Sequence, residues 1–171
     1  LAAVPEQKNG QKPVVLMPNP FYQVYLGAAV TAGAEPVLVP ADRQNGFLPN
    51  YAALPDDILA RTALAYYCSP ANPQGAIAPM ETMKQLVELA RAHDFVLVSD
   101  ECYSELYYGD PPTGAAEACA ALGDIDKGAM KNVVAMNSLS KRSSAPGLRS
   151  GFVAGDADLI AVGREIMYNP F

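Results

Sequence analysis

Short apolar runs alternate along this chain with longer segments in which apolar residues recur at helical spacing. Between Pro79 and His93, apolar side chains fall every three or four positions, at Met83, Leu86, Val87, Leu89 and Ala90, which predicts an amphipathic helix. Phe95–Ser99 is continuously apolar and predicts a strand buried on both faces. The other predicted strands are Pro13–Met17, Val37–Val39, Thr62–Tyr67, Asn132–Met136 and Ser150–Ala154, and the other predicted helices are Phe21–Ala32, a short one from Tyr51 onward, Ala115–Leu122 and Asp156–Arg164.

Strands and helices therefore alternate throughout, with no repeats or low-complexity linkers between them. This order is typical of a mostly parallel sheet covered by helices on both faces. We predict a single α/β domain, a three-layer αβα sandwich.

Composition limits the kind of partner. Half of the 171 residues are apolar, yet no apolar run is long enough to cross a bilayer. The formal net charge of -6 argues against nucleic acid or an anionic membrane surface, because both require a basic face. Small molecules remain as the expected ligands.

The cysteine and histidine content excludes several chemistries. Three cysteines (Cys68, Cys102 and Cys119) form no CxxC pair, so neither a zinc site nor a disulfide framework is predicted, and we expect a reducing, cytoplasmic location. His93, the only histidine, ends the predicted helix, where a surface position is expected. A histidine-dependent triad or metal centre is therefore not expected within the chain.

Residues 137–149 (NSLSKRSSAPGLR) place one lysine among hydroxyls and follow it with an arginine. The segment comes directly after a predicted strand, where open α/β sheets bind ligands, and Pro146 and Gly147 argue against a helix running through it. Ser138, Ser140 and Arg149 suit a phosphate, and Lys141 can form a Schiff base with an aldehyde. A phosphorylated aldehyde, pyridoxal 5'-phosphate, has both groups. The alternative is a solvated basic turn.

Two further loops follow predicted strands, and parallel strands would place all three loops on one rim. Asp100 ends the Phe95–Ser99 strand, where a carboxylate needs a partner, and a protonated pyridine nitrogen is a suitable one. Asn72 and Tyr103 can donate to a phenolic oxygen, and Tyr22 offers an aromatic face for stacking. Each residue also has a structural interpretation, as a helix N-cap, a turn former or a core aromatic. Because these residues share one predicted location, a common cofactor site is favoured over separate structural roles.

Glu101, Cys102 and Glu105 are interpreted as structural residues, since no pattern places them on the rim. A nicotinamide-binding Rossmann fold would need a GxGxxG motif after the first strand, and the sequence has none there.

Three segments carry a resemblance to a known family: SPANPQG (69–75), SDECYSELY (99–107) and NSLSKRSSAPGLRSGF (137–152). They resemble the cofactor motifs of class I/II, fold-type I aminotransferases, and the last two are most similar to the bacterial N-succinyldiaminopimelate subgroup of lysine biosynthesis. The resemblance implies pyridoxal phosphate as cofactor, amino and keto acids as substrates with glutamate as the expected donor, and a homodimer. It gives Lys141 the covalent link, Asp100 the pyridine nitrogen, Asn72 and Tyr103 the phenolic oxygen, Tyr22 the ring face, and Ser138, Ser140 and Arg149 the phosphate.

The chain departs from the family pattern in two respects. Gln74 replaces the usual threonine, which puts little in doubt. Family members are also considerably longer, so we expect residues 1–171 to be the central part of the cofactor-binding large domain, without an upstream phosphate loop or the C-terminal small domain. On that expectation the 171 residues alone would lack activity. The alternatives are another aminotransferase of this type, a C–S lyase, or a non-catalytic aminotransferase-like ligand-binding domain.

Overall fold

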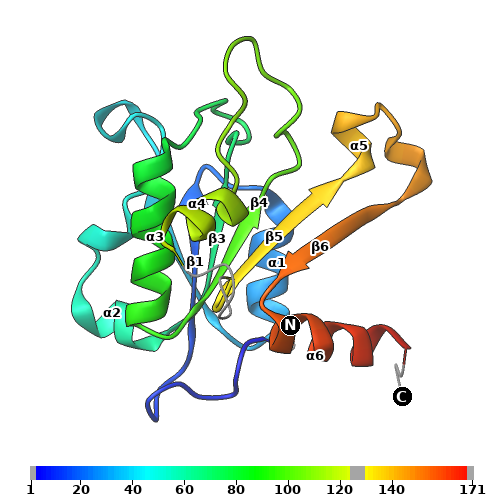
Figure 1. Cartoon of the computed structure of the whole chain (residues 1–171). Coiled ribbons are helices and arrows are strands. Elements are labelled where there is room, and N and C mark those ends of the chain that lie inside the picture. The colour runs from blue at the N-terminus through cyan, green and yellow to red at the C-terminus, as the bar shows by residue number, and fades with distance from the viewer. Residues whose placement is uncertain (1–2, 124–129, 169–171) are drawn as a thin grey trace.

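A computed structural model describes residues 3–123 and 130–168 of the chain, with side chains through residue 163. One six-stranded sheet forms its centre, in the order β2-β1-β3-β4-β5-β6 (Figure 1). The first five strands are mutually parallel, and only β6 runs antiparallel to its neighbour β5. The strands are β1 (Val14–Asn19), β2 (Glu35–Pro40), β3 (Thr62–Cys68), β4 (Val96–Asp100), β5 (Val133–Ser138) and β6 (Gly151–Gly155).

Helices cover both faces of the sheet, which confirms the predicted three-layer αβα sandwich. On one face, α3 (Met80–Ala92) and α4 (Ala115–Ala121) pack on the sheet together with α2 (Asp56–Arg61). The opposite face is covered by α1 (Gln23–Thr31), with Leu159 of α6 (Ala157–Tyr168) packed against the same apolar cluster.

Successive strand residues supply the two apolar clusters in turn, as the pleat of a strand requires. In β1, Val14 and Leu16 belong to the cluster beneath α3, while Val15 and Met17 belong to the cluster beneath α1. In β4, the four residues from Val96 to Ser99 are all buried, which confirms the prediction of a strand covered on both faces.

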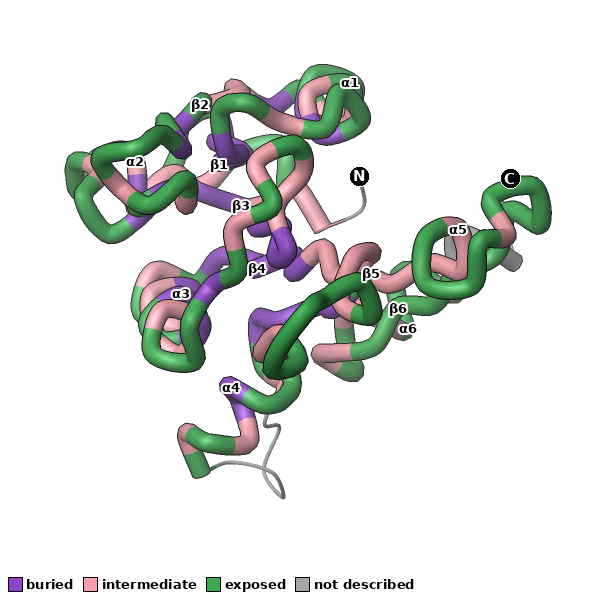
Figure 2. Tube along the Cα trace, turned by 90° about the horizontal axis from the view of Figure 1, so that it is seen from above, coloured by how far each residue is buried: buried purple, intermediate pink, exposed green. Residues whose placement is uncertain are grey.

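The β5–β6 end of the sheet differs from the centre. Burial is concentrated in the central strands, whereas β6 and the segment between β5 and β6 are largely exposed (Figure 2). That segment contains a single helical turn, α5 (Leu139–Arg142), and the 3-10 turn η3 (Pro146–Leu148). As expected from Pro146 and Gly147, no α-helix runs through them, and they form only the 3-10 turn η3. The turn α5 was not predicted, and it ends before the proline.

Element boundaries shift by one to a few residues from the predictions. The short helix expected from Tyr51 is the 3-10 turn η2 (Tyr51–Ala53), and α2 begins only at Asp56; a second 3-10 turn, η1 (Arg43–Asn45), precedes them. Asp156 caps α6, because its Oδ1 accepts from the backbone N–H groups of Asp158 and Leu159.

Within residues 3–123 and 130–168, no helix combines the length and apolar character needed to cross a bilayer. The same residues contain no group of three or more His, Cys, Asp or Glu side chains arranged to hold a metal ion. All three cysteines are free thiols, with Cys68 and Cys119 buried and Cys102 partly exposed.

Candidate functional site

The parallel strands bring the predicted site residues to one edge of the sheet. Cys68 of β3 pairs in register with Asp100 of β4, and Asp100 pairs with Met136 of β5, so the three strands reach that edge at the same level. The loops that follow them carry Asn72, Tyr103 and Lys141, in line with the expectation of a shared rim.

Asp100 accepts hydrogen bonds on both carboxylate oxygens. Oδ1 accepts from the backbone N–H of Cys102 at 3.1 Å, and Oδ2 accepts from the hydroxyl of Tyr25 on α1. The Tyr25 ring is buried and stacked on Tyr66, with the ring centroids 4.2 Å apart and the planes 8° from parallel. Burial, then the neighbouring Cys68 and Asp100, raises the pKa of Tyr25, so its hydroxyl remains a proton donor to Asp100.

Tyr25 was not predicted from the sequence as a site residue. Its spacing of three from Tyr22 places both tyrosines on one side of α1, and their rings meet edge to face at 5.7 Å. Tyr22, the predicted stacking residue, is 45% exposed at the N-cap of α1. The same helix therefore holds an exposed aromatic face at the rim and a buried donor to Asp100.

Two thiols lie close to the Asp100 carboxylate. Burial raises the pKa of Cys68 to about 11, with the negative charge of Asp100 as the second cause. Burial also raises the pKa of Cys102 to about 12, followed by its hydrogen bond to Asp100, while the cation of Lys141 lowers it. Cys102 therefore lies beside Asp100, and both thiols stay protonated at neutral pH.

Glu101 and Glu105 turn away from Asp100. Oε1 of Glu101 accepts from the Ser99 hydroxyl at 3.0 Å and from the backbone N–H of Ala115 at 2.8 Å, so this carboxylate supports the start of α4. Glu105 instead pairs with Arg142, with 3.5 Å between Oε1 and the guanidinium nitrogen.

Lys141 lies on α5, and its Nζ is 5.8 Å from the centroid of the Tyr103 ring. The helical turn is capped by Ser138, whose Oγ accepts from the backbone N–H of Ser140 at 3.1 Å and donates to the Ser140 Oγ at 2.9 Å. The hydroxyls of the two serines predicted to bind phosphate are thus adjacent, with Ser138 at the start of the helical turn and Ser140 directly before the lysine.

Arg149 is not joined to the serines by a hydrogen bond within the described residues. It adopts a left-handed backbone conformation with φ of 48°, and its guanidinium donates to the Pro146 carbonyl at 2.9 Å. The loop itself does return to the serines, because the carbonyl of Ser150 accepts from the backbone N–H of Leu139 at 3.1 Å. Arg149 thus lies in the loop that follows Ser138 and Ser140, and its guanidinium is directed at its own turn.

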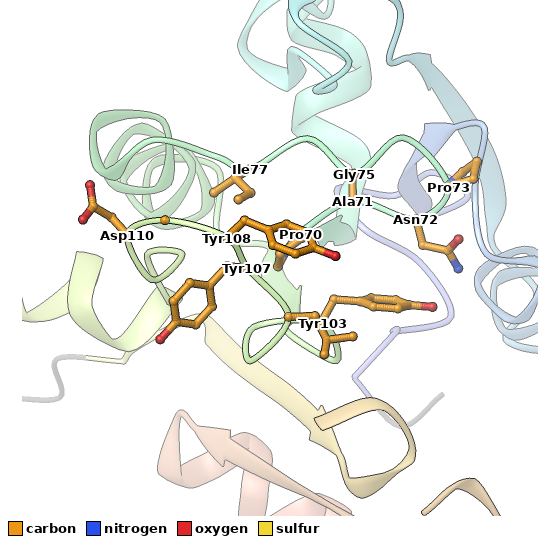
Figure 3. A pocket seen from close by; sticks show the side chains of 12 residues that line it. Pro70, Ala71, Asn72, Pro73, Gly75, Ile77, Tyr103, Tyr107, Tyr108 and Asp110 are labelled. Atoms are coloured by element: carbon orange, nitrogen blue, oxygen red, sulfur yellow. The ribbon is translucent and has the colours of Figure 1, made fainter. Parts of the chain in front are cut away.

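Asn72 and Tyr103 line a common groove of about 630 Å³ between the loop after β3 and the segment after β4. In the close-up, the Asn72 amide and the Tyr103 phenol lie on the same side of this groove, and Tyr107 lies toward its other end (Figure 3). Neither Asp100 nor Lys141 lines the groove, so it adjoins the rim rather than covering it. Its lining residues are Pro70, Ala71, Asn72, Pro73, Gly75, Ile77, Tyr103, Leu106, Tyr107, Tyr108, Gly109 and Asp110.

Comparison with known proteins gives relatives across almost the whole chain. Residues 5–167 match the family model "Aminotransferase class I and II". An LL-diaminopimelate aminotransferase from Halothermothrix orenii is 36% identical over 86% of this chain and 36% of its own length. The chain thus spans a little over a third of the length of the curated relatives it matches.

Solved structures show the same architecture. Aminotransferase AspB from Helicobacter pylori superposes with a TM-score of 0.82 and 43% identity over 94% of this chain and 41% of that protein. A probable N-succinyldiaminopimelate aminotransferase from Thermus thermophilus gives 0.77 and 27% identity over 94% of this chain and 40% of that protein. With the family model matched from residue 5 to residue 167, this chain belongs to the class I and II aminotransferases, a family of pyridoxal-phosphate-dependent enzymes.

Proposed function

We propose that this chain forms the cofactor-binding rim of an aminotransferase that exchanges an amino group between an amino acid and a keto acid. The observation that carries the proposal is the convergence of Lys141, Tyr103 and Asp100 at the carboxyl edge of the sheet. Lys141 lies over the Tyr103 ring, and Cys102 is within electrostatic range of both Lys141 and Asp100.

The Asp100 carboxylate suits the pyridine nitrogen of pyridoxal phosphate. Both of its oxygens have neutral donors, Tyr25 and the Cys102 backbone, and among the described residues no lysine or arginine forms an ion pair with it. A partly buried carboxylate with no cationic partner is stabilised by a ligand that brings one positive charge. Asp100 would hold the proton on that ring nitrogen.

The remaining predicted residues fit the other groups of the cofactor. The hydroxyls of Ser138 and Ser140 and the guanidinium of Arg149 are the donors for a phosphate, once Arg149 exchanges the Pro146 carbonyl for the anion. Asn72 and Tyr103 would bind the phenolic oxygen, and the exposed face of Tyr22 would cover the ring. When bound, the cofactor supplies the electron sink that stabilises a carbanion at the substrate Cα.

Lys141 would act twice through its Nζ atom. It would hold the cofactor covalently, and as a free amine it would accept the proton that leaves the substrate Cα. Its exposed position on α5, above the Tyr103 ring, leaves the amine accessible for both tasks.

For the substrates, we propose glutamate as amino donor and a keto acid of the diaminopimelate type as acceptor, either free or N-succinylated. The names of the relatives support this choice, since they include LL-diaminopimelate and probable N-succinyldiaminopimelate aminotransferases.

We also propose a cytoplasmic homodimer. Free thiols agree with a reducing compartment, and the exposed apolar side chains of Leu148, Phe152 and Val153 agree with surface that another subunit covers.

The covalent link is tested on the 171-residue chain by adding pyridoxal phosphate, reducing with borohydride and mapping the modified peptide. We expect the pyridoxyl group on Lys141 in the wild type and its loss in Lys141→Ala. Lys131, which precedes β5 at the opposite edge of the sheet, provides the matched control Lys131→Ala. Equal labelling of Lys131 and Lys141 would contradict the assignment.

The reaction itself is tested in the complete reading frame that contains these 171 residues. We expect glutamate-dependent amination of a diaminopimelate-type keto acid, reduced by roughly a hundredfold to ten-thousandfold in Lys141→Ala, the range for loss of a general acid-base group. Amino transfer that persists in this variant would show that Lys141 is not the essential amine. Activity with other keto acids alone would support amino transfer as the reaction and would show that the proposed keto acid substrate is wrong.

A further inference from the structure

Two polar contacts join the turn after β4 to the end of β5 and to α5, and Lys141 lies between their two positions in the sequence. The Asn137 side-chain N–H donates to the Ser104 hydroxyl at 3.1 Å. Further along both segments, the guanidinium of Arg142 pairs with the Glu105 carboxylate at 3.5 Å. Arg142 directly follows Lys141, so the ion pair acts on the helical turn that carries the amine.

Lys141 lies on an element that has little other support. α5 has only four residues, none of them buried, and Lys141 and Arg142 are both exposed. Its backbone is tied mainly to its own loop, through the Leu139 N–H to the Ser150 carbonyl. A helical turn this short does not hold its own geometry in water, so contacts from neighbouring segments decide its position.

We propose that Glu105 and Arg142 are positioning residues that set Lys141 relative to Tyr103 and Asp100. The proposal rests on the proposed function, because it takes Lys141 as the amine that attaches the cofactor. Glu105 holds the Arg142 guanidinium toward the turn that carries Tyr103, and this fixes the side of α5 that faces the rim. The Asn137–Ser104 hydrogen bond joins the end of β5 to the same turn, so Lys141 lies between two contacts with the turn after β4.

The ion pair between Glu105 and Arg142 is partly exposed, so it can influence the position of Lys141 while contributing little to the stability of the fold. The side chains of Arg142 and Glu105 keep 35% and 49% of their exposure. Ion pairs of this kind change an equilibrium by roughly 1.5-fold to fivefold. Breaking this one should therefore leave the unfolding temperature almost unchanged while altering how often Lys141 reaches a productive position.

The test measures the rate at which pyridoxal phosphate labels Lys141 in the 171-residue chain, by borohydride quenching at fixed times and mass spectrometry. The variants are Glu105→Arg, Arg142→Glu and the double exchange. Positioning predicts that each single variant slows labelling by roughly 1.5-fold to fivefold and that the exchange restores it, since the exchange recreates the pair. A purely electrostatic effect on the anionic cofactor predicts opposite signs, because Glu105→Arg adds positive charge near Lys141 and Arg142→Glu removes it.

The chain offers a matched control in the exposed pair of Glu81 and Lys84 on α3, with 3.0 Å between the charged atoms. Glu81→Lys, Lys84→Glu and their exchange should leave labelling of Lys141 unchanged. Single variants at 105 and 142 that label like the wild type, or an exchange that fails to restore the rate, would overturn the positioning role alone. A wild type with no preference for Lys141 would overturn the proposed function and the positioning role together.

Discussion

Tyr25, on α1, donates its phenolic proton to Oδ2 of Asp100 at the carboxyl end of β4, across 75 positions of sequence. The tyrosine ring is 5% exposed and stacked on Tyr66, so packing fixes the direction of the hydroxyl. Together with the backbone N–H of Cys102, it holds the carboxylate in one orientation. The carboxylate that we propose as the partner of a cationic ring nitrogen is therefore arranged before any ligand binds.

The first prediction concerns Tyr25→Phe, which removes this donor and keeps the stacked ring. A hydrogen bond to a charged group contributes about 1.5–3 kcal/mol, and we expect the affinity for pyridoxal phosphate to fall by roughly tenfold, because the Asp100 carboxylate loses half of its support. Absorbance titration of the 171-residue chain with the cofactor measures the change.

The matched control is Tyr66→Phe, which also keeps the stack and removes a hydroxyl that makes no hydrogen bond within the described residues. Equal losses of affinity in the two variants would show that the tyrosine stack, and not the bond to Asp100, determines binding.

A second prediction concerns Asp100→Asn, which nearly preserves shape and removes the negative charge. We expect the cofactor still to label Lys141, because the proposed phosphate donors Ser138, Ser140 and Arg149 are unchanged. The conversion of glutamate to its keto acid in the complete reading frame should slow by about a hundredfold or more, as when an electrostatic stabiliser is removed from other active sites. A rapid-mixing measurement of this single turnover gives the rate. Wild-type rates in the Asn variant would assign Asp100 a purely structural role.

The third prediction uses the buried thiol of Cys68, which donates to the Pro70 carbonyl at 3.2 Å. Its pKa is raised to about 11 in the folded protein, whereas an unfolded thiol titrates near about 8.5. Between these values the unfolded chain has lost the proton and the folded chain retains it, so the free energy of unfolding decreases as pH rises. The contribution is fully present below the unfolded pKa and is lost on approach to pH 11.

Urea unfolding at pH about 7.5 and about 9.5 tests this, with an expected loss of about 1 kcal/mol from Cys68 alone. Cys68→Ser removes the titrating group and should flatten the pH dependence by that amount. An identical slope in the wild type and in Cys68→Ser would contradict the prediction.

The three layers of the fold could be predicted because the apolar spacing of each segment indicates which of its faces must be buried. The apolar spacing of Met83, Leu86, Val87 and Ala90 in α3 and the continuous run of β4 each have one structural solution that buries them. The direction of β6 was not specified in this way. An apolar run looks the same in either direction, and the antiparallel pairing arises because the connection from Ser138 to Gly151 returns to the same edge of the sheet.

The site was predictable where it depends on loops that follow strands, and not where it depends on contacts between distant elements. Asp100, Tyr103 and Lys141 could be placed on one rim from strand order alone. Tyr25 occupies a core-like helical position, so nothing in its local sequence indicates a bond to Asp100. The direction of Arg149 depends on a left-handed backbone angle and on the Pro146 carbonyl, which composition does not reveal.

The last prediction concerns Gly151, the β6 residue that pairs with Ser138 directly before the Lys141 turn. A Cβ added there would lie 2.5 Å from the backbone carbonyl oxygen of Asn137, which cannot move without shifting the end of β5. We expect Gly151→Ala to destabilise the fold by about 1–3 kcal/mol, the usual cost of overpacking. It should also slow pyridoxal phosphate labelling of Lys141, since a shift at the end of β5 moves the start of α5, which follows Ser138 directly.

Gly27 on α1 is the matched control, because a Cβ there meets no atom within 4 Å. Gly27→Ala should stabilise the protein by up to about 1 kcal/mol through helix propensity and leave labelling unchanged. Urea unfolding and the labelling assay, applied to both variants, give four measurements. If Gly151→Ala retained wild-type stability and labelling, the β5–β6 pairing would not determine where Lys141 lies, and support for the amine would have to come from the turn after β4 alone.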